Sequence, residues 1–135
     1  MFLRSMSLVV GLLLATPLVA QDSVPIHFES GTSGATINGT IIGEEYIDYV
    51  LGARGGQTMT VSLKVTGTNG NGIANFNVLP AGEDFPALYN SSMTGEMDGK
   101  VVLPEDGDWA IRVYLMGNDR DTGKTVGYSI NVSIR

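Results

Sequence analysis

The sequence predicts an all-β fold, an antiparallel two-sheet β-sandwich of about eight short strands. Apolar and polar residues alternate with a period of two in several short segments, as in strands that bury one face. Glycine, asparagine and aspartate interrupt these segments at intervals of about eight to twelve residues. No window shows the apolar stripe of an amphipathic helix.

Four of the predicted strands lie in the N-terminal half of the chain, between turns rich in glycine and polar residues. In the third, Tyr49 and Leu51 share one face, and Tyr46 and Asp48 share the other. In the fourth, every second residue from Met59 onward is apolar, which makes the alternation clearest there. These strands are residues 24–28, 35–41, 46–53 and 57–65.

Four further strands are predicted in the C-terminal half. Trp109, the only tryptophan, begins an alternating apolar face and is expected in the core or at its edge. Tyr128 begins a second such face in the last strand. The long loops between strands are where a sandwich usually carries its function. The strands are residues 74–79, 99–103, 109–116 and 128–135, and the long loops are residues 66–73, 81–98 and 116–125.

The first twenty residues are typical of a secretory signal peptide. Arg4 gives a basic start, residues 8–14 form an apolar run broken by one glycine, and Ala20 is a small residue at the expected cleavage site. The run is shorter than the roughly 20 apolar residues of a membrane-spanning helix. We therefore expect a signal peptide at residues 1–20, cleaved after about Ala20, and a single β-sandwich domain at residues 21–135 in the periplasm. An uncleaved N-terminal anchor is the alternative.

The composition limits the partners that the chain can bind. It has no cysteine, so no disulfide supports the fold. The formal net charge is −6, and it becomes −7 once Arg4 leaves with the signal peptide. We expect no nucleic-acid partner and no membrane partner, because phosphate groups require a basic face. An acidic domain attracts a basic protein; acidity that only maintains solubility is the alternative. The oligomeric state is left open.

The chain has too few reactive groups for an active site, so we expect no enzyme, no catalytic residue and no cofactor. His27, the only histidine, falls in the first predicted strand and cannot form a histidine metal cluster alone. Acidic pairs such as Glu44 and Glu45 fall in predicted turns, where carboxylates are common. No metal site is expected either, and a structural calcium ion near Asp106 or Asp119 is the alternative.

The loop at residues 115–124 has an unusual composition for this chain. It carries Arg120 and Lys124, two of only eight basic residues, and Tyr114 and Met116 lie beside it. An arginine at a loop tip can bind a partner carboxylate through two hydrogen bonds, and arginine and tyrosine are favoured at interfaces. The loop is therefore either a binding surface or an ordinary polar hairpin.

Two longer stretches resemble known sandwich families. Residues 39–63, which begin G-T-I-I-G-E-E-Y, and residues 103–114, L-P-E-D-G-D-W-A-I-R-V-Y, resemble the bacterial pre-peptidase C-terminal type of β-sandwich. The stretch R-V-x-x-x-x-N-D at residues 112–119 is more specific, and it resembles the periplasmic inhibitors of goose-type (g-type) lysozyme. The resemblance extends over nearly all of residues 21–135.

The resemblance implies a protein that inhibits a lysozyme, most often of the g type, by placing loops in the enzyme's substrate cleft. It implies a lysozyme as the protein partner and no catalysis by the chain itself. Tyr46, Asn118 and Asp119 match the family pattern, and Arg120 lies one position from an arginine of the family loop. These four residues are the predicted lysozyme-binding site.

The chain departs from the family pattern at three contact positions. Gly117 and Asp121 stand where the family loop has arginines, and Glu44 stands where it has a tyrosine. A different lysozyme type, a rearranged loop or another binding role would each account for these departures. The main alternative is a module that binds polysaccharide or protein without inhibition, with Tyr46, Tyr89 and Tyr114 as the candidate sugar-binding residues.

Overall fold

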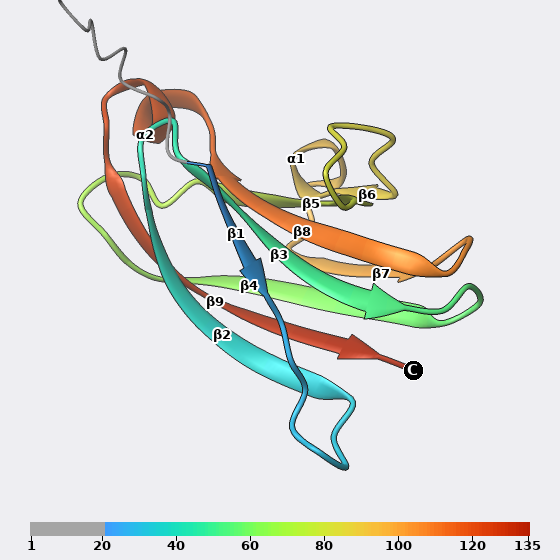
Figure 1. Ribbon diagram of the computed structural model, residues 1–135. Helices are drawn as coiled ribbons and strands as arrows, with labels where there is room; N and C mark the ends of the chain where they lie inside the picture. Colours follow the sequence, from blue (N-terminus) through green and yellow to red (C-terminus); the bar gives the residue numbers. More distant parts are fainter. Residues whose placement is uncertain (1–20) are drawn as a thin grey trace, which may run out of the picture.

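The computed structural model describes residues 21–135, and the expected signal peptide lies outside the described residues. Two β-sheets pack face to face as a sandwich, which confirms the predicted all-β class (Figure 1). One sheet has the order β1 (Gln21–Pro25), β3 (Tyr46–Ala53), β8 (Gly107–Leu115), β5 (Ala74–Pro80) and β6 (Tyr89–Asn90). The other has the order β2 (Gly34–Ile42), β9 (Thr125–Ile134), β4 (Thr58–Thr68) and β7 (Asp98–Val102).

The first strand lies three residues earlier than the predicted segment 24–28, and it pairs in parallel, whereas an antiparallel sandwich was predicted. Strand β1 ends at Pro25, so His27 lies beyond it and is exposed. Proline has no backbone N–H and fixes its own φ, which favours the end of an edge strand.

The chain reverses direction once between β1 and β2 and again between β2 and β3. Strand β1 therefore pairs with β3 in parallel, whereas every other strand pair is antiparallel within the described residues.

The other seven predicted strands are confirmed with small shifts at their ends, and three short elements were not predicted. These are β6, the four-residue helix α1 (Ser91–Thr94) and the five-residue helix α2 (Gly117–Asp121). A helix of one turn is too short to show an apolar stripe in the sequence. Helix α1 begins after the N-cap residue Asn90, whose side chain accepts a hydrogen bond from the Ser92 N–H at 3.0 Å.

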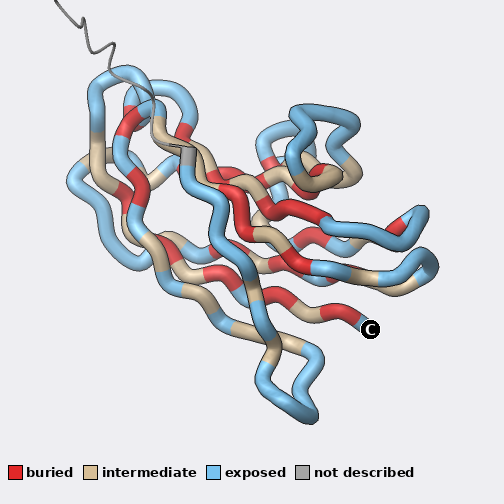
Figure 2. Tube along the Cα trace, in the orientation of Figure 1, coloured by how far each residue is buried: buried red, intermediate tan, exposed pale blue. Residues whose placement is uncertain are grey.

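The core lies between the two sheets. Figure 2 shows buried residues along the strands of both sheets. Trp109 is buried there, as predicted. Tyr49 of β3 and Tyr128 of β9 meet across the core with their hydroxyl oxygens 2.6 Å apart. Burial raises the pKa of both phenols, so they remain neutral and share one hydrogen bond. Other buried side chains include Ile41, Leu51, Met59, Val61, Phe76, Val78, Ile111, Val113 and Ile130.

The tyrosine pair requires a glycine at position 39. A Cβ atom on Gly39 would lie 2.5 Å from the Tyr128 hydroxyl oxygen and 2.7 Å from that of Tyr49. We expect Gly39→Ala to lower the free energy of unfolding by about 1–3 kcal/mol, since overpacking displaces both rings. Gly67→Ala is the matched control, because a Cβ there meets nothing within 4 Å. Urea denaturation of the two variants checks this, and equal midpoints would contradict it.

Candidate functional site

Three loops meet at one end of the sandwich, shown at the upper left of Figure 1. They are the β2–β3 turn at residues 43–45, the β4–β5 loop at residues 69–73 and the β8–β9 loop at residues 116–124, which contains α2. We call this region the three-loop end. Hydrogen bonds join the loops: the Gly43 N–H donates to the Lys124 carbonyl at 3.0 Å, and the Met116 N–H donates to the Ile73 carbonyl at 3.4 Å. The three loops therefore hold one another in place.

Asp119 of α2 is the buried anchor of this end. Its side chain is fully buried, and its carboxylate accepts backbone N–H groups from Asn71, Gly72 and Ile73 at 2.8, 2.7 and 3.0 Å. These hydrogen bonds, led by that from Asn71, lower the pKa of the Asp119 carboxyl below its ordinary value. A Cβ on Gly70 would collide with the carboxylate, so glycine is required there. Asp119 thus ties α2 to the β4–β5 loop.

The solvent side of α2 carries the exposed residues of the predicted site. Asn118 is exposed, and its backbone carbonyl accepts the Thr122 N–H at 2.9 Å. Arg120 is 51% exposed and donates from Nε to Asp121 Oδ1 at 3.0 Å. An exposed ion pair of this kind contributes about 0–1 kcal/mol. Arg120 can therefore exchange its partner for another carboxylate at little cost.

Gly117 begins α2 in a backbone conformation that favours glycine. Its φ of 62° lies in the left-handed region, where a side chain with a Cβ is strained. The preceding residue, Met116, caps the helix with extended backbone and no side-chain hydrogen bond. An arginine at position 117 would therefore be strained in the backbone conformation that this turn requires.

An open groove of about 310 Å³ lies beside α2, on the outer face of the five-stranded sheet. The groove brings together Tyr46 and Arg120, which are far apart in the sequence. Asn118 and Asp119, the other two predicted residues, lie on α2 but do not line the groove. The lining residues are Glu44, Glu45, Tyr46, Asn77, Arg112, Tyr114, Leu115 and Arg120.

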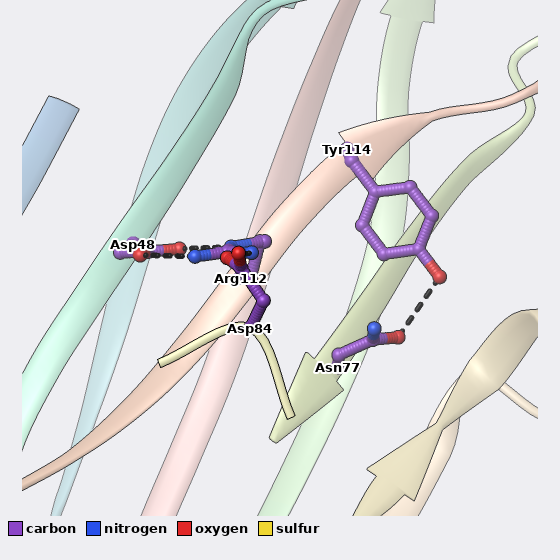
Figure 3. A network of polar contacts seen from close by, with 5 residues as sticks. All are labelled: Asp48, Asn77, Asp84, Arg112 and Tyr114. Carbon is purple, nitrogen blue, oxygen red and sulfur yellow. Dashed lines mark hydrogen bonds and ion pairs between the residues drawn. The ribbon is translucent and has the colours of Figure 1, made fainter. Parts of the chain in front are cut away.

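The groove is backed by a polar network on β3, β5 and β8 (Figure 3). Arg112 binds both carboxylate oxygens of Asp48, with Nε at 2.8 Å and Nη2 at 3.0 Å. Its Nη1 contacts Asp84 at 2.9 Å, and its guanidinium lies 4.5 Å from the centre of the Tyr46 ring. The pair with Asp48 is largely shielded from solvent, since the two side chains are 14% and 6% exposed. This network fixes the orientation of Tyr46 in the groove.

The sequence did not single out Asp48 or Arg112 as site residues. Alternation placed Asp48 on the same face of its strand as Tyr46, and gave no sign that the carboxylate would be buried. The available signal was an aspartate opposite an arginine on paired strands, but the pairing of β3 with β8 in that register was not known from the sequence.

The three tyrosines considered for sugar binding lie in two places. Tyr46 and Tyr114 are directly opposite each other on β3 and β8 and both line the groove. The Tyr114 hydroxyl donates to Asn77 Oδ1 at 2.8 Å. Tyr89 lies elsewhere, with its ring stacked on Phe76 and its hydroxyl bonded to the Glu96 carbonyl at 2.7 Å. The groove therefore offers two aromatic rings rather than three.

The acidic turns show ordinary structural contacts. Asp106 accepts the Gly55 N–H at 2.7 Å, while Asp121 pairs with Arg120. Within residues 21–135, no group of three histidine, aspartate or glutamate side chains is arranged to hold a metal ion. The same part of the chain has no helix that is long and apolar enough to span a membrane.

Comparison with known proteins finds similar chains over nearly the whole length. The structure resembles that of a periplasmic inhibitor of g-type lysozyme from Aeromonas hydrophila, with 33% identity, a TM-score of 0.75, and 85% of this chain and 97% of that one covered. The inhibitor of g-type lysozyme from Escherichia coli (strain K12) is 29% identical over 133 residues, which is 98% of this chain and 96% of that protein.

A third neighbour shows the fold alone. The pre-peptidase C-terminal domain of a collagenase from Bacillus anthracis is 12% identical, with a TM-score of 0.54 and coverage of 86% of this chain and 95% of that one. No family model matches the chain.

Proposed function

Because the chain belongs to the family of periplasmic inhibitors of g-type lysozyme, we propose that it inhibits a g-type lysozyme in the periplasm by binding it with the three-loop end and the groove. The resemblance to this family in the sequence is confirmed by the two inhibitors that it matches. These relatives are inhibitors rather than enzymes, which agrees with the expected lack of catalysis. The proposal includes export, with cleavage of residues 1–20 after about Ala20.

The observation that carries the proposed binding surface is the groove that joins Tyr46 to Arg120. The loops around it are already fixed by hydrogen bonds, so little conformational entropy is lost when they bind a partner. Arg120 offers a planar guanidinium that can bind a carboxylate of the lysozyme through two hydrogen bonds. Asn118 lies exposed on the same helix and adds a polar contact.

Asp119 has a different role in this proposal. Its carboxylate is buried and bonded to the backbone of residues 71–73, so it is out of reach of a protein partner. We assign it as a positioning residue that presents Asn118 and Arg120. Gly117 and Asp121 stand where the family loop has arginines, and we assign Arg120 as the arginine that takes over their role.

Charge supports association with a basic enzyme. Residues 21–135 carry a net charge of −7, because the only charged residue of the first twenty is Arg4. An acidic inhibitor is attracted to a basic lysozyme, and the association becomes slower as salt screens the two charges. Inhibition should therefore be strongest at low ionic strength.

Replacing Arg120 tests the contact surface directly. We expect Arg120→Ala to raise the inhibition constant against a g-type lysozyme by roughly tenfold, the effect of removing one interface anchor. Arg54→Ala is the matched control, because Arg54 is an exposed arginine in the β3–β4 turn at the opposite end of the sandwich. Lysis of a peptidoglycan suspension measures both. If the two variants inhibit equally well, the surface is assigned to the wrong end.

A second function is favoured by one observation. Tyr46, Tyr114 and Asn77 line a groove of about 310 Å³, a combination suited to a sugar ring. A glycan-binding module would show a change in tyrosine fluorescence when soluble peptidoglycan fragments are added, without inhibition of any lysozyme. Inhibition with no such change would exclude this alternative.

A further inference from the structure

A long excursion of the chain lies over the outer face of the five-stranded sheet, at the upper right of Figure 1. It consists of residues 81–97 and includes β6 and α1, and we call it the arm. The arm carries the two most exposed large apolar side chains of the described residues, Phe85 at 77% and Met93 at 84% exposure. Single exposed apolar residues are common on protein surfaces. Two such side chains in one segment beside a proposed binding groove require an explanation.

Specific contacts hold the arm against the sheet. Ser91 is fully buried, donates to Asn75 Oδ1 at 3.0 Å and accepts the Phe76 N–H at 2.8 Å. The Leu88 N–H donates to the Val78 carbonyl at 2.8 Å. The arm is therefore a fixed part of the fold, and its apolar side chains are presented at defined positions.

Two of the contacts that hold the arm are made by residues of the groove. Asp84 pairs with Arg112, and Ser92 lies 3.3 Å from the Tyr114 hydroxyl. Arg112 and Tyr114 both line the groove. Phe85 directly follows Asp84 in the sequence, and Met93 directly follows Ser92. Each exposed apolar residue is thus one position away from a residue bonded to the groove, so the arm borders the groove.

We propose that Phe85 and Met93 form a second contact surface for the same lysozyme, which would then lie across the groove from α2 to the arm. This inference rests on the proposed function. The arm contains three acidic residues and no basic one. Asp84 is already paired with Arg112, so the exposed Glu83 and Glu96 are the carboxylates that can attract a basic lysozyme surface. The apolar residues would supply buried area, and the acidic residues would favour the correct orientation.

The test is a double variant, Phe85→Ser with Met93→Ser. We expect its inhibition constant and its dissociation constant for a g-type lysozyme to rise by roughly tenfold or more, the effect of losing two apolar anchors. Val102→Ser is the matched control, because Val102 is 64% exposed on β7 of the opposite sheet. Met93→Ser alone is measured as well, together with urea midpoints, so that a folding defect in the double variant is recognised.

The results of these measurements distinguish contact by the arm from inhibition of the lysozyme itself. Folded arm variants that bind as tightly as the wild-type protein overturn the second surface and leave inhibition intact. A wild-type protein that neither binds nor inhibits a g-type lysozyme overturns both. Weaker binding by the arm variants, with unchanged binding by Val102→Ser, supports the arm as a contact.

Discussion

Replacing Arg112 with methionine is expected to lower the free energy of unfolding by about 3–5 kcal/mol. The guanidinium binds both oxygens of Asp48, whose side chain is only 6% exposed. Removing it leaves a buried carboxylate without its partner, which costs more than the ion pair itself contributes. Urea denaturation followed by Trp109 fluorescence measures the change, because Trp109 is buried in the core.

Two controls separate the buried charge from the rest of the network. The double variant Asp48→Leu with Arg112→Met is expected to recover most of the loss, since no unpaired charge remains. Asp84→Asn is expected to cost less than about 1 kcal/mol, because Asp84 is 77% exposed and its pair with Arg112 is partly screened. If Arg112→Met alone were as stable as the wild-type protein, Asp48 would not depend on this contact.

Replacing Asp119 with alanine is expected to have the largest effect on inhibition among substitutions in α2. Three backbone N–H groups of residues 71–73 lose their acceptor, and the β4–β5 loop loses its link to the helix. We expect the inhibition constant to rise by more than roughly tenfold, through a loosened loop rather than a lost contact. Faster amide hydrogen exchange at residues 71–73 should accompany it. Asp121→Ala, exposed on the same helix, is the control and should leave this exchange unchanged.

The Asp119 anchor also predicts a pH dependence. Its pKa in the folded protein is lowered, led by the hydrogen bond from Asn71, so the folded state favours the ionised carboxylate. Its stabilising contribution is complete above the ordinary aspartate pKa of about 3.9 and is lost as the pH falls through the lower folded value. Inhibition should therefore persist in mildly acidic solution and weaken only as the pH falls through the lowered pKa of the folded protein. Asp119→Asn should remove this part of the acid dependence; if the variant retained it in full, another group would be responsible.

Much of the fold could be predicted from the sequence, because alternation fixes both the strands and their buried faces. Tyr49 and Leu51 were placed together on one face of β3, and both are buried in the core. Alternation does not show which outward face another segment will cover. Asp48 lies on the outward side of β3 and is nevertheless buried, because Arg112 of the neighbouring strand covers it. Neither β6 nor the two short helices contain enough residues to show a period.

The site could be predicted only in part. Tyr46 and Arg120 were selected from the sequence, and the structure places both in one groove. The anchoring contacts of Asp119 could not be predicted, because its three donors lie 46 to 48 residues away in the sequence. Such a contact depends on how three loops meet at one end of the sandwich. The bond between the arm and the groove, from Asp84 to Arg112, depends on tertiary structure for the same reason.

The most direct test of the central claim is the lysis of a peptidoglycan suspension by a g-type lysozyme while purified protein, residues 21–135, is titrated in. Chicken-type and invertebrate-type lysozymes are measured in parallel. We expect the g-type enzyme to lose its activity near an equimolar ratio and the other two types to be unaffected at that ratio. Full activity of the g-type enzyme in the presence of a large excess of folded protein would contradict it.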